Sequence, residues 1–359
     1  MGHALLNGVY DWQGGTRGDK KAFVAGMVMG SARRDLGENG RLQLRAMLSP
    51  DPLMGKAGYP LHLAAGESAD GLQTLVDRQH PHELVMELSA SFSRRLSDSD
   101  SLFLYAGLPG EPAFGPPAFM HRLSAMDSPE APITHHWLDS THIVFGVVTA
   151  GFVHDRWKAE VSRFKGREPD EDRYDIENPK LDSTAARLSW NPTDNASLQA
   201  SFAKLKSPEQ LDPEVDVRKY SLSAIHTAPI GRDGWWSATV GWGRKRVPLE
   251  DLTFDAWTVE AAVKPNASWT FFGRGERANT DELLFETHFH QDGRPHRHHG
   301  PPYWVSKISA GVVRDFRLNA RASLGIGALY ALNFVPGDLE PSYGGDPRGA
   351  MAFVRLKLN

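Results

Sequence analysis

Residues 84–107 read LVMELSASFSRRLSDSDSLFLYAG and contain two segments in which apolar and polar side chains alternate. In the first segment the apolar row consists of Leu84, Met86, Leu88, Ala90 and Phe92, and the polar row of Glu87, Ser89, Ser91 and Ser93. A period of two predicts a strand with two unlike faces. Ser97-Asp98-Ser99 carries turn chemistry, so the stretch predicts a β-hairpin.

The same alternation recurs along the chain, whereas helical periodicity is hard to find. The clearest further examples are residues 41–48, 186–190, 257–264 and 350–358. Each of them combines an apolar row with a polar or charged row. The pattern therefore predicts an all-β chain whose sheet has one greasy and one polar face.

The connections between these segments alternate between short and long. Short turns fall at 37–40, 97–99, 154–156, 191–195, 231–234, 264–266 and 315–319. Long Pro-, Gly- and His-rich loops fall near 14–20, 50–81, 108–140, 166–181, 207–216, 247–253, 279–300 and 334–348. Seven turns and eight loops give sixteen strands with both termini on the short-turn side. This is typical of a transmembrane antiparallel β-barrel of the outer membrane, with short periplasmic turns and long extracellular loops.

Composition excludes several classes of protein. The chain has 359 residues, a net charge of −4 and no cysteine, so nucleic acid is not an expected partner and thiolate metal sites and disulfides are excluded. Its longest apolar stretch, Ile143 to Val153, is about half of what a spanning helix needs. Met1-Gly2-His3-Ala4 does not resemble a signal peptide, so we expect any export signal to be absent from this chain.

Aromatic residues cluster near the predicted strand ends, as in the interfacial girdles of membrane barrels. They are Trp157, Trp190, Trp235, Trp236, Trp242, Trp257, Trp269, Tyr303 and Trp304. Tryptophans also cap soluble β-sandwiches and propellers, but no blade-length repeat is visible. The chain ends in Asn359 instead of the aromatic residue that usually ends such barrels.

The polar faces of the predicted strands carry more basic than acidic residues. The acidic candidates are Glu87, Glu160, Glu260 and Glu276. The basic candidates for the lumen are Arg41, Arg45, Lys158, Arg187, Lys219, Lys264, Arg274, Lys307, Arg321, Arg355 and Lys357. One interpretation is a positive lumen that favours anions, because a narrow channel focuses such a field. The other is that these charges pair across strands and only hydrate the interior.

Four stretches carry a resemblance to a known family. They are the proline-rich segment 107–142, "LSPDPLMGKAGYPL" (48–61), "DRQHPHEL" (77–84) and "NPKLDSTAARLSWNP" (178–192). Together they resemble a family of largely uncharacterised proteobacterial outer-membrane β-barrel proteins, over nearly the whole chain. The resemblance implies the barrel and its compartment and transfers no activity. The architecture is also similar to sixteen-stranded porins, in which the third long loop folds into the barrel.

The third loop is rich in ionisable groups held between six prolines. The candidates for a pore constriction are His121, Arg122, Asp127, Glu130, His135, His136, Asp139 and His142. If the loop folds inward, they form a selectivity filter or pass metal ions, since imidazole and carboxylate suit divalent transition metals. Alternatively, they hold the loop to the barrel wall through hydrogen bonds and ion pairs.

A second histidine-rich segment, HFHQDGRPHRHHG, occupies 288–300 in the seventh loop. Its histidines are His288, His290, His296, His298 and His299, and imidazoles at this density can bind Cu or Zn. Their spacing fits no defined metal motif, so a solvated loop is the alternative. His80 and His82 lie near another loop end and are further candidates.

Enzymatic activity is not expected. Ser140, His136 and Asp139 have the residue types of a lipid hydrolase, but adjacency in a loop does not establish a triad. A gated receptor that imports chelates is not expected either. It needs about twenty-two strands and a separate plug domain, and the chain is too short for both.

The sequence thus predicts a single outer-membrane barrel over 1–359 that lets small polar or anionic solutes pass and requires no cofactor. The first alternative function is a metal-handling barrel, and the second is a lipid-modifying enzyme at the rim. A closed barrel with a structural role is a further alternative. The expected partners are outer-membrane lipid, lipopolysaccharide and small solutes or ions, and the sequence leaves the oligomeric state open.

Overall fold

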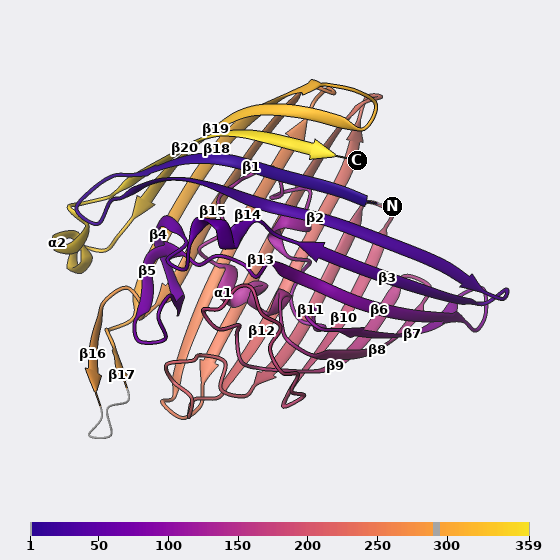
Figure 1. The fold of residues 1–359 in the computed structure, drawn as a ribbon, viewed down its shortest axis with the longest axis horizontal. Coiled ribbons are helices and arrows are strands. Elements are labelled where there is room, and N and C mark those ends of the chain that lie inside the picture. The colour runs from indigo at the N-terminus through magenta and orange to yellow at the C-terminus, as the bar shows by residue number, and fades with distance from the viewer. Residues whose placement is uncertain (1, 290–294, 359) are drawn as a thin grey trace.

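The computed structural model describes the backbone of residues 2–289 and 295–358, and the side chains of these residues outside 285–299. The described chain folds into a closed antiparallel barrel of sixteen strands (Figure 1). In order around the barrel they are β1 (Gly2–Gln13), β2 (Lys20–Leu36), β3 (Gly40–Leu48), β6 (Val85–Arg95), β7 (Asp100–Gly107), β8 (Val147–His154), β9 (Trp157–Phe164), β10 (Ser183–Thr193), β11 (Ala196–Leu205), β12 (Val217–Ile230), β13 (Gly234–Val247), β14 (Leu252–Lys264), β15 (Trp269–Thr280), β18 (Tyr303–Arg317), β19 (Ala322–Phe334) and β20 (Arg348–Leu358).

The remaining elements lie in the long loops. The second loop contains η1 (Asp51–Met54) and the hairpin of β4 (Tyr59–Ser68) and β5 (Thr74–Gln79), and the seventh contains the hairpin of β16 (Phe285–Phe289) and β17 (Pro295–His299). The third loop contains η2 (Phe119–His121), α1 (His135–Leu138) and η3 (Ser140–His142), and the eighth contains η4 (Gly337–Leu339) and α2 (Glu340–Tyr343). No helix of the described residues is long and apolar enough to cross a membrane.

The last strand pairs with the first, from Ala4 with Leu358 to Gln13 with Gly349, and this pairing closes the barrel. Every two barrel strands that follow each other in the chain are neighbours, and a predicted short turn or long loop joins them. Both termini lie at the same end as the β2–β3 turn (Figure 1). The predicted fold class, an all-β antiparallel barrel of sixteen strands, is confirmed. Closure satisfies the backbone groups of every barrel strand, which a chain in lipid requires.

Alternation along each strand separates an apolar outside from a polar or packed inside. On β14, Val259 is 54% exposed on the outer face, whereas its neighbours Thr258 and Glu260 are buried inside. Trp157 and Trp190 stack outside the barrel at the short-turn end with ring centres 5.1 Å apart. Trp235 departs from the predicted girdle, because it packs against the apolar cluster inside the barrel.

Strand β6 departs from the simple alternation, and the β10–β11 pair has a second register irregularity between Trp190 and Thr193. The register of β3 with β6 shifts between Met47, which opposes Glu87, and Leu48, which opposes Val85. Met86 is the extra residue of this bulge, and it is fully buried, although the sequence pattern predicts it on the same face as Leu88. A bulge inserts one residue and so reverses the side that its neighbours face.

The interior is filled unevenly by loops. The β4–β5 hairpin, the third loop (108–146) and the eighth loop pack together against the inner faces of β1, β2, β14, β15 and β18–β20. This cluster contains Tyr59, Leu61, Phe119 and Ile133 from the loops. The part of the lumen beside these strands is therefore filled by packed side chains.

The outer face provides a test of the membrane orientation of the strands. We expect Val259→Arg to lower the free energy of unfolding by about 2–4 kcal/mol, because it places a charge on the lipid-facing side near mid-strand. Val263→Arg, on the same face of β14 but next to the turn, should cost about 0–1 kcal/mol. Urea unfolding in lipid vesicles measures both, and equal costs would contradict a membrane-embedded outer face.

Candidate functional site: the third loop and the lumen

The third loop runs inside the barrel, and most of its side chains are buried. Its short helix α1 lies against β12 and β13. A Cβ atom on Gly243 of β13 would come within 2.6 Å of the Trp137 carbonyl oxygen, so only glycine permits this approach. The N–H groups of Ala113 and Gly115 donate to the hydroxyls of Ser162 on β9 and Ser201 on β11. The loop thus crosses the lumen from the β9–β11 wall to the opposite side.

Arg122 is the central anchor of this loop. Its guanidinium donates two hydrogen bonds to Glu260 of β14, at 2.9 and 2.7 Å, and a third at 2.7 Å to Asp139 within the loop. All three side chains are at most 2% exposed. Burial opposes ionisation of Asp139, but His135 and Arg122 outweigh it and hold its pKa well below its usual range.

Two further loop carboxylates meet basic residues of the wall. Glu130 pairs with Lys307 of β18 at 2.5 Å and with Arg274 of β15 at 3.2 Å. Asp127 pairs with Arg355 of β20 and, at 3.4 Å, with Lys357. The contacts of four loop candidates are therefore of the kind that would hold the loop to the barrel wall. These candidates are Arg122, Asp127, Glu130 and Asp139.

The basic wall candidates divide into four groups. Lys219, Arg274, Lys307, Arg355 and Lys357 contact the third loop, with Lys219 donating to Ser140 at 2.7 Å. Arg45, Lys158 and Arg187 line an open chamber. Lys264 pairs with Asp315 inside the barrel. Arg41 pairs with Asp35 beside the short turn, exposed, and Arg321 lies in the turn before β19 instead of on the wall.

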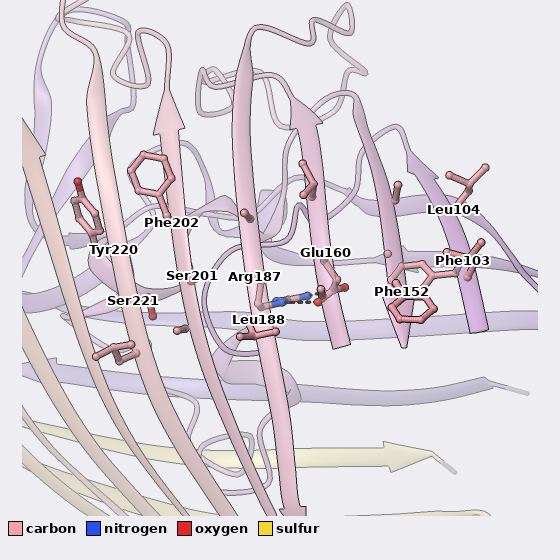
Figure 2. A pocket seen from close by; sticks show the side chains of 18 of the residues that line it. Phe103, Leu104, Phe152, Glu160, Arg187, Leu188, Ser201, Phe202, Tyr220 and Ser221 are labelled. Atoms are coloured by element: carbon pink, nitrogen blue, oxygen red, sulfur yellow. Dashed lines mark hydrogen bonds and ion pairs between the residues drawn. The ribbon is translucent and has the colours of Figure 1, made fainter. Parts of the chain in front are cut away.

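The chamber has a volume of about 550 Å³ and is lined by residues of β3 and β6–β12. It extends from Glu111, Ala113, Gly115 and Pro117 of the third loop to Asp155-Arg156-Trp157 at the β8–β9 turn. Figure 2 shows the Arg187–Glu160 pair of β10 and β9, in a wall whose outer face carries Leu104, Phe152 and Leu188. Unlike the rest of the lumen, this side is open.

Charge in the chamber is paired but unevenly exposed. Arg45 is 37% exposed and its partner Glu87, at 2.6 Å, is 5% exposed. Lys158 is 39% exposed and its partner Glu160, at 3.1 Å, is 5% exposed. Arg187 also donates to Glu160. A solute in the chamber would therefore meet the cationic ends of these pairs before the carboxylates behind them.

Glu111 is the one chamber carboxyl of the third loop that sequence analysis did not single out. Burial raises its pKa to about 7, although Arg187 opposes the rise. Tyr105 accepts a hydrogen bond from the backbone N–H of Glu111 at 3.2 Å and donates to Glu87 at 3.1 Å. This carboxyl can change its charge near neutral pH at the surface of the chamber.

The third-loop histidines meet His80 and His82 of the second loop. The histidine cluster consists of His80, His82, His135, His136 and His142, which are joined by ring-centre distances between 5.0 and 6.3 Å. Sequence analysis named His80 and His82 as further metal-binding candidates beside the seventh-loop histidines, without linking them to the third loop. Only the folded loops show that they belong with the third loop.

The members of this cluster differ in electrostatics. Burial and the neighbouring His135 lower the pKa of His136 to about 3 and that of His142 well below its usual value. Burial acts in the same direction on His82, but hydrogen bonding to Asp51 outweighs it and raises the pKa. His121 stands apart, where burial and Arg45 lower its pKa to about 4.

The seventh-loop histidines are only partly described. The backbone of the β16–β17 hairpin pairs His288 with His296, but His290 and the side chains of His288, His296, His298 and His299 lie outside the described residues. Among the residues that are described, no three His, Cys, Asp or Glu side chains are arranged to hold a metal ion.

The hydrolase combination is not assembled. Ser140 accepts a hydrogen bond from Lys219 and donates one at 3.5 Å to the backbone oxygen of His136. Asp139 contacts His135 at 2.5 Å and Arg122 instead. The triad types are neighbours in sequence without forming a Ser–His–Asp relay.

Comparison with known proteins supports the fold. The chain is similar to an anion-selective porin from Comamonas acidovorans, with a TM-score of 0.54, 10% identity and coverage of 100% of this chain and 99% of the porin. It is also similar to OprB of Pseudomonas putida, with a TM-score of 0.59, 10% identity and coverage of 100% of this chain and 93% of OprB. A third similar structure is OmpF of Salmonella typhi in complex with daunomycin, with a TM-score of 0.57, 12% identity and coverage of 100% of this chain and 97% of OmpF. No family model and no curated protein matches the sequence. The chain has a porin-like sixteen-stranded barrel fold.

The Arg122 anchor provides a second test. We expect Arg122→Met to lower the free energy of unfolding by about 3–5 kcal/mol, because it leaves the buried Glu260 without an ion-pair partner and removes one of the two basic partners of Asp139. Arg41→Met removes an exposed pair and should cost less than about 1 kcal/mol. Denaturant unfolding followed by tryptophan fluorescence compares the two, and a similar small cost for both would show that the loop is held by other contacts.

Proposed function

We propose that this barrel is an outer-membrane channel through which small polar solutes, preferentially anions, pass by diffusion along the chamber lined by β3 and β6–β12. The observation that carries the proposal is the exposure of Arg45 and Lys158 in front of the buried carboxylates Glu87 and Glu160. In a narrow chamber with apolar walls outside, such exposed cations raise the local concentration of anions. The short turns and both termini face the periplasm in this proposal, and lipid and lipopolysaccharide surround the outer face.

The chamber makes passive passage a better proposal than chemistry. Its lining combines serine and glutamine side chains, including Ser91, Ser189 and Gln199, with the paired charges. Such groups hydrate a solute without binding it tightly, as conduction requires. The Ser140 contacts described above provide no relay for a hydrolase.

Conductance in planar bilayers under a KCl gradient tests the proposal. We expect open channels with a reversal potential that indicates anion preference. A correctly folded barrel without conductance, or with cation preference, would contradict it.

The role of the exposed cations is tested separately. Arg45→Gln combined with Lys158→Gln should lower the anion-to-cation permeability ratio by about twofold or more, because it removes two exposed charges. Glu87 keeps its bonds from Ser89 and Tyr105, and Glu160 keeps Arg187, so both acids stay paired. Arg321→Gln, which removes a charge in a turn outside the chamber lining, is the matched control. An equal change in the control would rule out the chamber as the selective region.

Glu111 makes the selectivity depend on pH. Because its pKa is raised to about 7, Glu111 is mainly neutral below this pH and mainly anionic above it. Anion preference should therefore fall as pH rises from about 6 to 8. Reversal potentials of the wild type and of Glu111→Gln measure this, and the variant should lose the pH-dependent step. An unchanged step in the variant would assign the titration to another group.

A further inference from the structure

Two groups of largely buried potential metal ligands lie at the third loop, one between the second and third loops and the other between the third loop and β2, β3 and β6. One is the histidine cluster. The other is a methionine cluster made of Met27, Met29, Met47, Met86 and Met120, which contains five of the nine methionines of the chain. Ile143, which directly follows His142, packs among these methionines, and Met120 directly follows Phe119, whose ring centre lies 6.4 Å from those of His82 and His142.

The hydrogen bonds of three histidines orient their rings in the same way. The Nδ1 atoms of His82, His135 and His142 contact Asp51 at 2.8 Å, Asp139 at 2.5 Å and the backbone oxygen of Asp139 at 2.6 Å. Carboxylate and carbonyl oxygens only accept, so each Nδ1 donates a proton. Metal-binding histidines are held in this manner by carboxylates and backbone oxygens, which direct Nε2 to the metal.

Two of these Nε2 atoms have no partner in the described structure. Those of His82 and His142 are buried and make no hydrogen bond. Their rings are 5.2 Å apart, centre to centre. Two imidazoles that share a metal at about 2.0–2.1 Å bring their ring centres to roughly 5–6 Å. A buried nitrogen without a partner costs free energy, and a metal ion would satisfy both.

We propose that His82 and His142, together with thioethers of the methionine cluster, form a binding site for Cu(I). Thioether ligands favour Cu(I), whereas a site for Zn(II) is usually built from histidine, cysteine and carboxylate. The described residues contain no set of three such side chains arranged for a metal. Mixed imidazole and thioether ligation is the chemistry that remains, and it lies inside the loops, away from the seventh-loop histidines.

Methionine also fills irregular gaps in apolar cores, and this is the alternative explanation of the methionine cluster. Three features of the site favour the metal. The methionines pack with Ile143, the neighbour of His142 in the chain, the bulge of β6 turns Met86 to the inside of the barrel, and the Nε2 atoms of His82 and His142 make no hydrogen bond in the described structure.

Copper at this site would also stabilise the third loop. Asp139 contacts both His135 and His142 and accepts a hydrogen bond from Arg122, the central anchor. A ligand that binds only the folded loops raises their stability by mass action. Bound Cu(I) or the redox-inert Ag(I) should therefore raise the melting temperature of the full barrel.

The test is a titration of the full chain in detergent with Cu(I) under reducing, anaerobic conditions, against a chromophoric Cu(I) chelator. We expect stoichiometric binding that weakens by about tenfold or more in His82→Gln combined with His142→Gln, because both imidazole ligands are lost. The matched control replaces His288, His290, His296, His298 and His299 by Gln and should leave tight binding unchanged. Heat-dependent mobility on gels checks that each variant is folded.

X-ray absorption at the copper edge keeps the test decisive if the histidine variant does not fold. We expect sulfur as well as nitrogen neighbours in the wild type, and loss of sulfur in Met47→Leu combined with Met86→Leu, a nearly volume-conserving change. Binding that survives loss of His82 and His142, binding lost with the seventh-loop histidines, or copper with nitrogen and oxygen neighbours only would overturn the proposal. These measurements do not depend on conductance, so a closed barrel leaves them intact.

Discussion

The rest of the structure depends on the buried ion pairs between the third loop and the barrel wall. Arg122 with Glu260, Asp127 with Arg355 and Glu130 with Lys307 are almost completely removed from solvent. An isolated charge in such a place is very costly, so each loop charge has to meet a wall charge of opposite sign. A loop rich in proline and ionisable residues is thereby held in one path across the lumen.

This path divides the lumen into two unlike parts. The second, third and eighth loops pack against β1, β2, β14, β15 and β18–β20, and the chamber remains beside β3 and β6–β12. The basic wall residues on the side where the loop is anchored form ion pairs and hydrogen bonds inside the barrel. Those on the chamber side have buried acidic partners and exposed cationic ends, as Arg45 and Glu87 illustrate. The same residue types thus serve structure on one side and are available to solutes on the other.

The anchored loop also brings two distant segments together. His82 follows the β4–β5 hairpin, and His142 lies at the end of the third loop, yet their rings are in contact. Asp139 connects this region to Arg122, because its side chain and its backbone oxygen serve different partners. Loop position, chamber shape and the proposed copper site are therefore coupled through one aspartate. The porin-like barrel supplies a rigid frame on which such a loop core can be built.

Alternation of period two, turn chemistry and the alternation of short and long connections determined the barrel, its sixteen strands and the common end of its termini. These are local signals, because strand faces and tight turns depend on residues close together in sequence. Only the tertiary structure decided which charges pair and which face Met86 occupies. The same holds for the contact between His82 and His142 and for the role of Glu111. These features depend on contacts between residues far apart in sequence and on one bulge that shifts a register, and no short window of sequence contains them.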